Sequence, residues 1–137
     1  MRRVIALDIG TVRIGVAVSD PLGFFAQGAA VLDAGGDWLA ELAKIAAQYE
    51  NPLILIGLPR RTDGSEGPEA ARMRETEQKI REYLPELETK FWDERFTTTI
   101  AQQALLEADV SRAGRKKKVD KIAATLLLQN YLDSKKF

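Results

Sequence analysis

The chain has 137 residues, and its 20 Lys and Arg balance 20 Asp and Glu, so that the formal net charge at pH 7 is zero. This length suits one domain with a full hydrophobic core, and we predict a single domain over 1–137. Because no overall field draws the chain towards nucleic acid or a membrane, any polyanion site must be a local patch.

The sequence contains no cysteine and no histidine. Disulfides, thiolate zinc sites and a cysteine nucleophile are therefore excluded, which suits a reducing compartment. The lack of histidine also excludes a Ser-His-Asp triad and a histidine metal site, so that catalysis would need carboxylates and a hard, oxygen-binding cation. Because no apolar run is long enough for a signal peptide or a membrane span, we expect a cytoplasmic protein without membrane contact.

Residues 4–20 predict a β-hairpin that carries an acid at its bend. Asp8 ends the first strand, Gly10 lies in the turn, and alternation along the second strand leaves one face with only small side chains, which another element can approach closely. An isolated buried carboxylate is costly, so Asp8 must be solvated, hydrogen-bonded or neutralised by a cation. The alternative role for Asp8 is to cap the turn, and this is the favoured role for Asp20.

The remaining pattern alternates between strands and helices, which indicates an α/β fold. We expect further strands over 24–32, 53–56 and 89–92. We expect helices over 38–49, with Asp37 as its cap, and over 68–84, 97–108 and 119–131. A glycine-rich loop over 57–68 leaves the central strand, in a position where loops often carry function.

Acidic residues lie at three element ends. Asp8 ends the first strand, Asp93 and Glu94 end the last strand, and Asp120 opens the final helix. If these groups converge, they repel one another unless a divalent cation lies among them. Mg²⁺ or Mn²⁺ there would activate water for phosphodiester hydrolysis without a histidine. Only one of Asp93 and Glu94 can face the site, and Glu94 is favoured for its reach, with Asp93 in reserve.

A basic run lies directly before Asp120 and would contact backbone phosphates without reading their sequence. Its cations are Arg112, Arg115, Lys116, Lys117 and Lys118. A solvated charged face is the alternative interpretation of this run. Further candidate nucleic-acid contacts, each equally consistent with an ordinary surface arginine, are Arg13, Arg60 and Arg61.

Four stretches resemble the YqgF (RuvX) family, a branch of the RuvC-like, RNase H-fold nucleases. They cover most of the chain and are ALDIGTVRIGVAVSD at 6–20, IGLPRRTDGSEGPEA at 56–70, DERFTT at 93–98, and 104–134. The resemblance implies an RNase H-like, five-stranded mixed sheet, with three antiparallel strands followed by two parallel ones and helices on both faces. It also implies Asp8, Glu94 and Asp120 as the metal-binding, catalytic acids. The pair Arg60-Arg61 departs from the more neutral stretch expected of the family.

The resemblance implies a Mg²⁺- or Mn²⁺-dependent nuclease, a hydrolase of phosphodiester bonds that processes the 5′ end of precursor 16S rRNA, with structured RNA as its partner. The alternatives are a Holliday junction resolvase acting on branched DNA and a non-catalytic nucleic-acid-binding module. A resolvase is expected to be dimeric, yet helix 68–84 has little apolar surface, so we expect a monomer or weak homodimer. An ATP-binding protein of the actin type would need a second domain, and a helix-turn-helix DNA binder is a weaker alternative.

Overall fold

One β-sheet carries the fold, with helices on each side of it. The computed structural model describes residues 2–94 and 112–135, and within 112–120 it describes the backbone alone. The described strands are β1 (Val4–Ile9), β2 (Arg13–Ser19), β3 (Ala26–Asp33), β4 (Leu53–Leu58) and β5 (Thr89–Asp93). The described helices are α1 (Trp38–Ala46), α2 (Pro68–Tyr83) and α4 (Arg112–Ser134).

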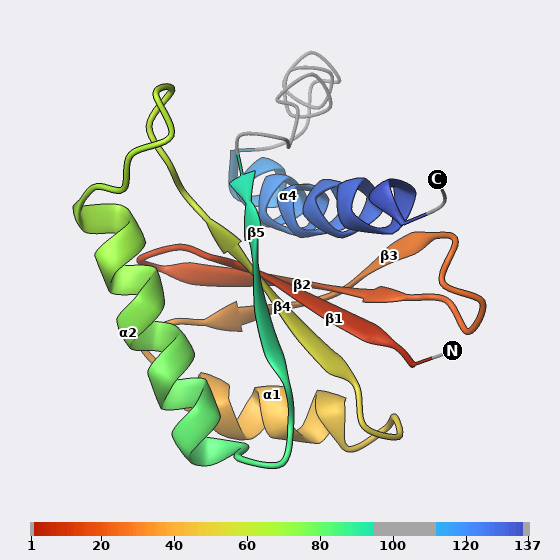
Figure 1. Cartoon of the computed structure of the whole chain (residues 1–137). Coiled ribbons are helices and arrows are strands. Elements are labelled where there is room, and N and C mark those ends of the chain that lie inside the picture. The colour runs from red at the N-terminus through yellow and green to blue at the C-terminus, as the bar shows by residue number, and fades with distance from the viewer. Residues whose placement is uncertain (1, 95–111, 136–137) are drawn as a thin grey trace.

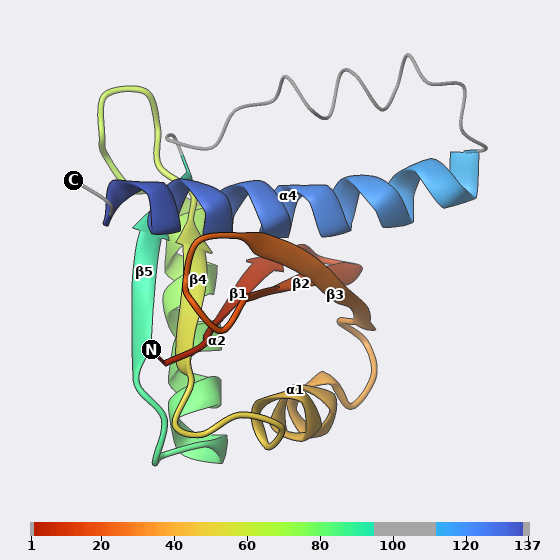
Figure 2. The same cartoon turned by 90° about the vertical axis from the view of Figure 1, so that its right-hand side faces the viewer.

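The strands lie in the order β3-β2-β1-β4-β5 (Figure 1). β2 is antiparallel to both β1 and β3, whereas β4 is parallel to both β1 and β5. α1 and α2 cover one face of the sheet, and α4 crosses the other face (Figure 2). The predicted α/β architecture is therefore confirmed, and the carboxyl ends of β1, β4 and β5 meet at one end of the sheet.

The turn between β1 and β2 forms as the sequence predicts. The N–H of Gly10 donates a hydrogen bond to the carbonyl oxygen of Arg13 at 2.9 Å. A Cβ atom on residue 10 would lie only 2.8 Å from the same oxygen, so only glycine fits there without a backbone shift. This tight return places Asp8 opposite Gly15 in the β1–β2 register.

The predicted face of small side chains on β2 is where α4 passes. Large side chains of β2 pack with α1 and α2, whereas Ala17, fully buried, packs beneath α4. α4 also passes over Gly28 of β3, where an added Cβ atom would make an ordinary contact of 3.4 Å with the hydroxyl oxygen of Thr125. The buried hydroxyl of Ser19 accepts a hydrogen bond from the N–H of Val4 at 2.8 Å. The close approach expected from the sequence is thus confirmed.

β3 begins at Ala26, two residues later than predicted. The carboxylate of Asp20 accepts hydrogen bonds from the N–H groups of Phe24 and Phe25 at 2.8 and 3.0 Å, and these bonds keep both residues in the turn. The bond from Phe25 is the largest cause that lowers the pKa of Asp20. The favoured role of Asp20 as a turn residue is confirmed.

β3 also carries an irregularity. Gly28 pairs with Ala17 and Ala30 pairs with Val16, so the intervening Ala29 is the extra residue of a bulge. β3 is an edge strand of the described sheet, and Ala29 is exposed there.

The final helix begins earlier than predicted. α4 starts at Arg112 rather than at residue 119, because Arg and Lys favour helix and extend it through the basic run. Asp37 occupies the N-cap position of α1, but its side chain makes no capping hydrogen bond, contrary to expectation. The helix expected over 97–108 lies outside the described residues. None of the described helices is both long and apolar enough to cross a bilayer.

Replacing Ala17 with Leu is expected to lower the free energy of unfolding by about 1–3 kcal/mol, because the added carbons enter a filled layer between β2 and α4. Ala29→Leu, the same change on the exposed edge strand, is the matched control and is expected to alter it by less than about 0.5 kcal/mol. Urea denaturation of the two variants checks this. Equal losses would contradict the close packing of α4.

Candidate active site

Asp8 lies near the carboxyl end of β1, on the face of the sheet that α4 covers. Leu7 pairs with Ile56 of β4, so Asp8 and Gly57 come next in register. Because side chains alternate along a strand, Asp8 shares its face with Val4 and Ala6, which both pack against α4. Asp8 itself is half-buried. The hairpin thus presents one carboxyl group beneath the helix layer, beside the central strand β4.

Glu94 follows β5 directly, and its side chain lies over Gly57 of β4. A Cβ atom on Gly57 would lie 2.9 Å from Cγ and 3.0 Å from Cδ of Glu94, and still closer to one carboxyl oxygen. Since β4 lies between β1 and β5, the missing side chain at Gly57 leaves the space through which Glu94 reaches Asp8. The two carboxyl groups share a side-chain hydrogen bond. Gly57 was not among the predicted site residues, although a glycine at the end of a buried strand often marks a close approach.

The surroundings of the acid pair, Asp8 and Glu94, raise the pKa of Glu94. Burial raises the pKa of Glu94 to about 8, and the charge and hydrogen bond of Asp8 and the charge of Asp93 act in the same direction. Glu94 therefore keeps its proton at neutral pH and donates it in the hydrogen bond to Asp8. A hard divalent cation prefers carboxylate oxygens and would relieve their repulsion in place of that proton. The donor set of the acid pair thus fits Mg²⁺ or Mn²⁺.

Asp93 lies on the opposite face of the sheet from Glu94. It pairs with Leu58, which packs against Ala70 and Met73 of α2. One carboxylate oxygen of Asp93 is 3.9 Å from Nε of Arg60. Of the two acids that end β5, the structure therefore brings Glu94, and not Asp93, to Asp8.

Asp120, the expected third acid, lies in α4, but its side chain is outside the described residues, as are those of the basic run. Within the described residues, no third carboxylate completes a metal-binding cluster with the acid pair. The next residue, Lys121, lies against Gly28 of β3. The structure thus describes two of the three predicted acids together.

The three predicted arginines lie at the same end of the sheet as the acid pair. Arg13 opens β2 directly after the bend, and Arg60 and Arg61 follow β4. Arg60 is 3.8 Å from a carboxylate oxygen of Glu66, which also accepts hydrogen bonds of 2.8 and 2.7 Å from Arg74. The bonds from Arg74 lower the pKa of Glu66. Arg60 is thus engaged with carboxylates of the loop and of β5.

Arg61 stabilises the glycine-rich loop through its backbone. Its N–H donates to the carbonyl of Ser65 at 2.9 Å, and its carbonyl accepts from the N–H of Gly64 at 2.8 Å. Neither Arg61 nor Arg13 forms an ion pair with any residue that the structure describes. Among the described residues, these two arginines therefore differ from Arg60, which lies close to two carboxylates.

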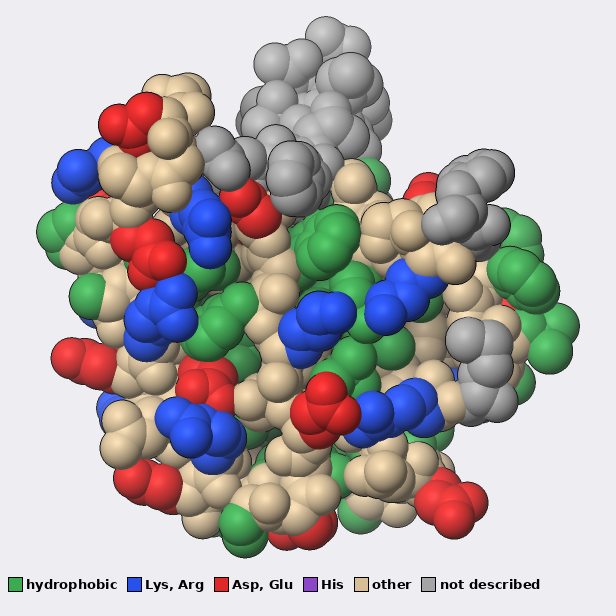
Figure 3. Space-filling model, in the orientation of Figure 1, with side chains coloured by type: hydrophobic (Ala, Val, Ile, Leu, Met, Phe, Trp, Pro, Cys, Tyr) green, Lys and Arg blue, Asp and Glu red, His purple; other side chains and the backbone are tan. Residues whose placement is uncertain are grey.

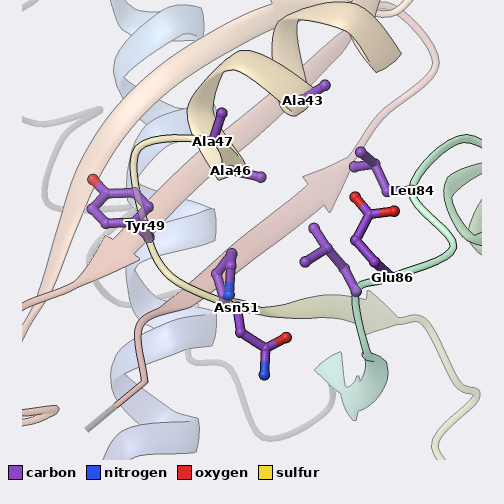
Figure 4. Close-up of a pocket in the computed structure, with 9 residues that line it drawn as sticks. Ala43, Ala46, Ala47, Tyr49, Asn51, Leu84 and Glu86 are labelled. Atoms are coloured by element: carbon purple, nitrogen blue, oxygen red, sulfur yellow. The ribbon is translucent and has the colours of Figure 1, made fainter.

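A separate cavity of about 340 Å³ lies at the opposite end of the sheet (Figure 4). Its lining comes from the end of α1 and from the segments just before β4 and β5, including Tyr49, Asn51 and Leu84. Glu86 is the acidic residue of this lining. Because a single carboxylate is a poor site for a divalent cation, this cavity does not compete with the acid pair as a candidate active site.

Comparison with solved structures places this protein in the class of RNase H-like, RuvC-type folds. T. thermophilus RuvC in complex with Holliday junction substrate aligns with a TM-score of 0.59 and 13% identity, covering 98% of this chain and 96% of that chain. The fowlpox virus Holliday junction resolvase aligns with a TM-score of 0.56 and 13% identity, covering 96% and 98%. At these identities the likeness concerns the fold.

The chain belongs to the family described as "RuvX: Holliday junction resolvase", whose model matches residues 2–134. A relative from Clostridium botulinum (strain Hall), named "Putative pre-16S rRNA nuclease", is 48% identical over 134 residues, which are 96% of this chain and 97% of the relative. One of the same name from Clostridium beijerinckii is 47% identical over 133 residues, 96% of each chain. The family predicted from the sequence is confirmed, and with it a nuclease of the rRNA-processing or resolvase type that acts on nucleic acid.

Gly57→Ala is expected to displace Glu94 from Asp8 and so to lower the pKa of Glu94 from about 8 towards its usual value of 4.5. Carboxyl ¹³C NMR titration of the metal-free protein measures this pKa directly. Gly28→Ala is the matched control, since its Cβ would meet Thr125 at an ordinary 3.4 Å. An unchanged Glu94 titration in Gly57→Ala would contradict the assigned role of this glycine.

Proposed function

We propose that this protein is a metal-dependent nuclease that hydrolyses phosphodiester bonds in structured RNA, and that it processes the 5′ end of precursor 16S rRNA. The observation that carries the proposal is the acid pair, which the fold holds together at the end of the central strands. The names of relatives at 48% identity support the choice of RNA substrate. We place this activity in the cytoplasm and assign it to a monomer or weak homodimer.

Asp8, Glu94 and Asp120 would hold Mg²⁺ or Mn²⁺ in this nuclease. Such an ion, when bound, lowers the pKa of a water molecule and stabilises charge on phosphodiester oxygens. The protein contributes the carboxylates, the backbone space at Gly57 and the α4 layer that keeps the acid pair half-buried. Arg13 and Arg61 would contact backbone phosphates near the acids, together with the basic run in α4.

A Holliday junction resolvase is the second candidate, favoured by the description of the family model. The proposed chemistry is the same, because both reactions hydrolyse a phosphodiester bond. The two candidates differ in the shape of the substrate, and a two-fold junction would call for a two-fold enzyme. Both candidate functions would be wrong if the protein binds nucleic acid without cleaving it.

Cleavage of labelled precursor-like RNA and of a four-way DNA junction tests the proposal. Asp8→Asn, Glu94→Gln and Asp120→Asn are each expected to lower the Mg²⁺- or Mn²⁺-dependent rate by about 100-fold or more, because each removes a metal ligand. Asp37→Asn, an exposed aspartate on α1's N-cap, is the matched control and should cleave normally. EDTA should abolish the reaction.

Faster cleavage of RNA supports the processing nuclease, and faster cleavage of the junction supports the resolvase. Binding without cleavage under either metal, equal in the parent protein and in Asp8→Asn, would leave only a binding module.

The metal-free protein is expected to lose stability as pH rises from about 5 to 8. Folded Glu94, with a pKa of about 8, keeps a proton that the unfolded chain, with a value of 4.5, has released. The folded state therefore binds more protons in this window, and the free energy of unfolding falls with rising pH. Melting temperatures in EDTA measure this loss, and Glu94→Gln should flatten it.

Addition of Mg²⁺ at pH 8 should restore the melting temperature, because a ligand of the folded state alone stabilises by about 2.7 kcal/mol at 100 times its Kd. Asp8→Asn should show no such gain. Equal gains in the two proteins would show that the ion binds elsewhere.

A further inference from the structure

Two lysines meet at one aromatic ring on the α4 side of the sheet. Tyr131 of α4 is only 3% exposed and packs edge-on against Trp92 of β5, with ring centroids 5.3 Å apart. The ammonium nitrogens of Lys90 and Lys135 lie 5.2 and 5.0 Å from the centroid of the Tyr131 ring. Lys90 belongs to β5, and Lys135 directly follows α4. We call these two residues the lysine pair.

Both side chains of the lysine pair are exposed. Neither ammonium group forms an ion pair with any carboxylate in the described part of the chain. On the face of the molecule that contains β5 and the end of α4, several Lys and Arg side chains lie around apolar ones, with Asp and Glu side chains among them (Figure 3). Attraction to the ring favours each ammonium, but two like charges at one ring repel each other. Anionic phosphate groups beside the two lysines would offset that repulsion.

One member of the lysine pair, Lys90, lies on the same strand that leads into Glu94 of the acid pair. Lys90, Trp92 and Glu94 lie on the same face of the sheet, because every second side chain of a strand points the same way. Lys90 is four residues before Glu94, which corresponds to a distance of about 13 Å along the strand at the usual rise per residue. β5 is the terminal strand of the described sheet, so its outer side is not paired with another described strand. A nucleic-acid strand at the acid pair could therefore continue along this edge and reach the lysines.

We propose that Lys90 and Lys135 form a phosphate-binding pair, which holds the backbone of the nucleic-acid strand a few nucleotides away from the bond at the acid pair. The inference rests on the proposed nuclease function and adds a contact site to it. The chemistry recognised is the phosphodiester backbone, which RNA and DNA share. The two lysines provide point charges for phosphate, while the ring of Tyr131, which packs edge-on against Trp92, attracts both ammonium groups.

A binding measurement that needs no cleavage tests the lysine pair. The background is Asp8→Asn, so that the nucleic acid stays intact, and the probes are a fluorescent RNA hairpin with a single-stranded extension and a four-way DNA junction. Fluorescence anisotropy is recorded over about 50 to 200 mM KCl, because each phosphate contact contributes about 0.7–0.9 to the slope of log K against log salt.

The double change Lys90→Gln with Lys135→Gln is expected to weaken binding by about tenfold or more and to reduce the salt slope by about 1.5. Gln keeps most of the side-chain length, so that cover over Tyr131 is retained. Lys90→Arg with Lys135→Arg should retain both affinity and slope. Lys44→Gln with Lys79→Gln, two exposed lysines on α1 and α2, is the matched control and should bind like the background protein.

Unchanged affinity and salt slope in the Gln double variant would overturn the lysine pair while leaving the nuclease proposal intact. An equal loss in the Arg double variant would also overturn it, because the loss would then come from packing rather than charge. A background protein that binds neither probe would remove both proposals. The probe with the larger loss identifies whether the pair holds RNA or DNA.

Discussion

The hydrogen bond between Asp8 and Glu94 depends on the arrangement of three strands of the sheet. Two carboxyl groups come together across β4 only because β1, β4 and β5 end at the same level and because Gly57 between them has no side chain. Burial, followed by the charge of Asp8, raises the pKa of Glu94 to about 8. The folded chain therefore holds an unfavourable arrangement of acids in place, which is a common property of sites that bind cations.

Local patterns in the sequence predict the strands, most of the helices and the acid at the end of β1. They could not predict that Gly57 lets Glu94 reach Asp8, because this depends on the register of β4 against β5. That register is set by packing far from Gly57 and Glu94. Alternation along β5 shows that only one of Asp93 and Glu94 can face the site, yet the face is decided by where α4 and α2 pack. The start of α4 at Arg112 is hard to predict because a run of like charges is typical of a solvated segment, although Arg and Lys also have high helix propensity.

A net charge of zero conceals a strongly uneven surface. Arg60 lies among carboxylates, so its charge is largely balanced locally, whereas Arg13 and Arg61 form no ion pair with the described residues. Lys90 of β5 and Lys135 after α4 place their ammonium groups near the ring of Tyr131. The distribution of partners, rather than the count of charges, decides which cations are free to meet a polyanion.

The bulge at Ala29 has a consequence for the behaviour of the protein in a crowded cell. β3, an edge strand of the described sheet, has no charged residue before Asp33. An uncharged open edge invites other chains to add a strand, and from there to aggregate. The extra residue breaks the even spacing of N–H and C=O groups along that edge, so an incoming strand loses its continuous ladder. β3 can thus present small side chains to α4 and still pair poorly with a strand from another protein molecule.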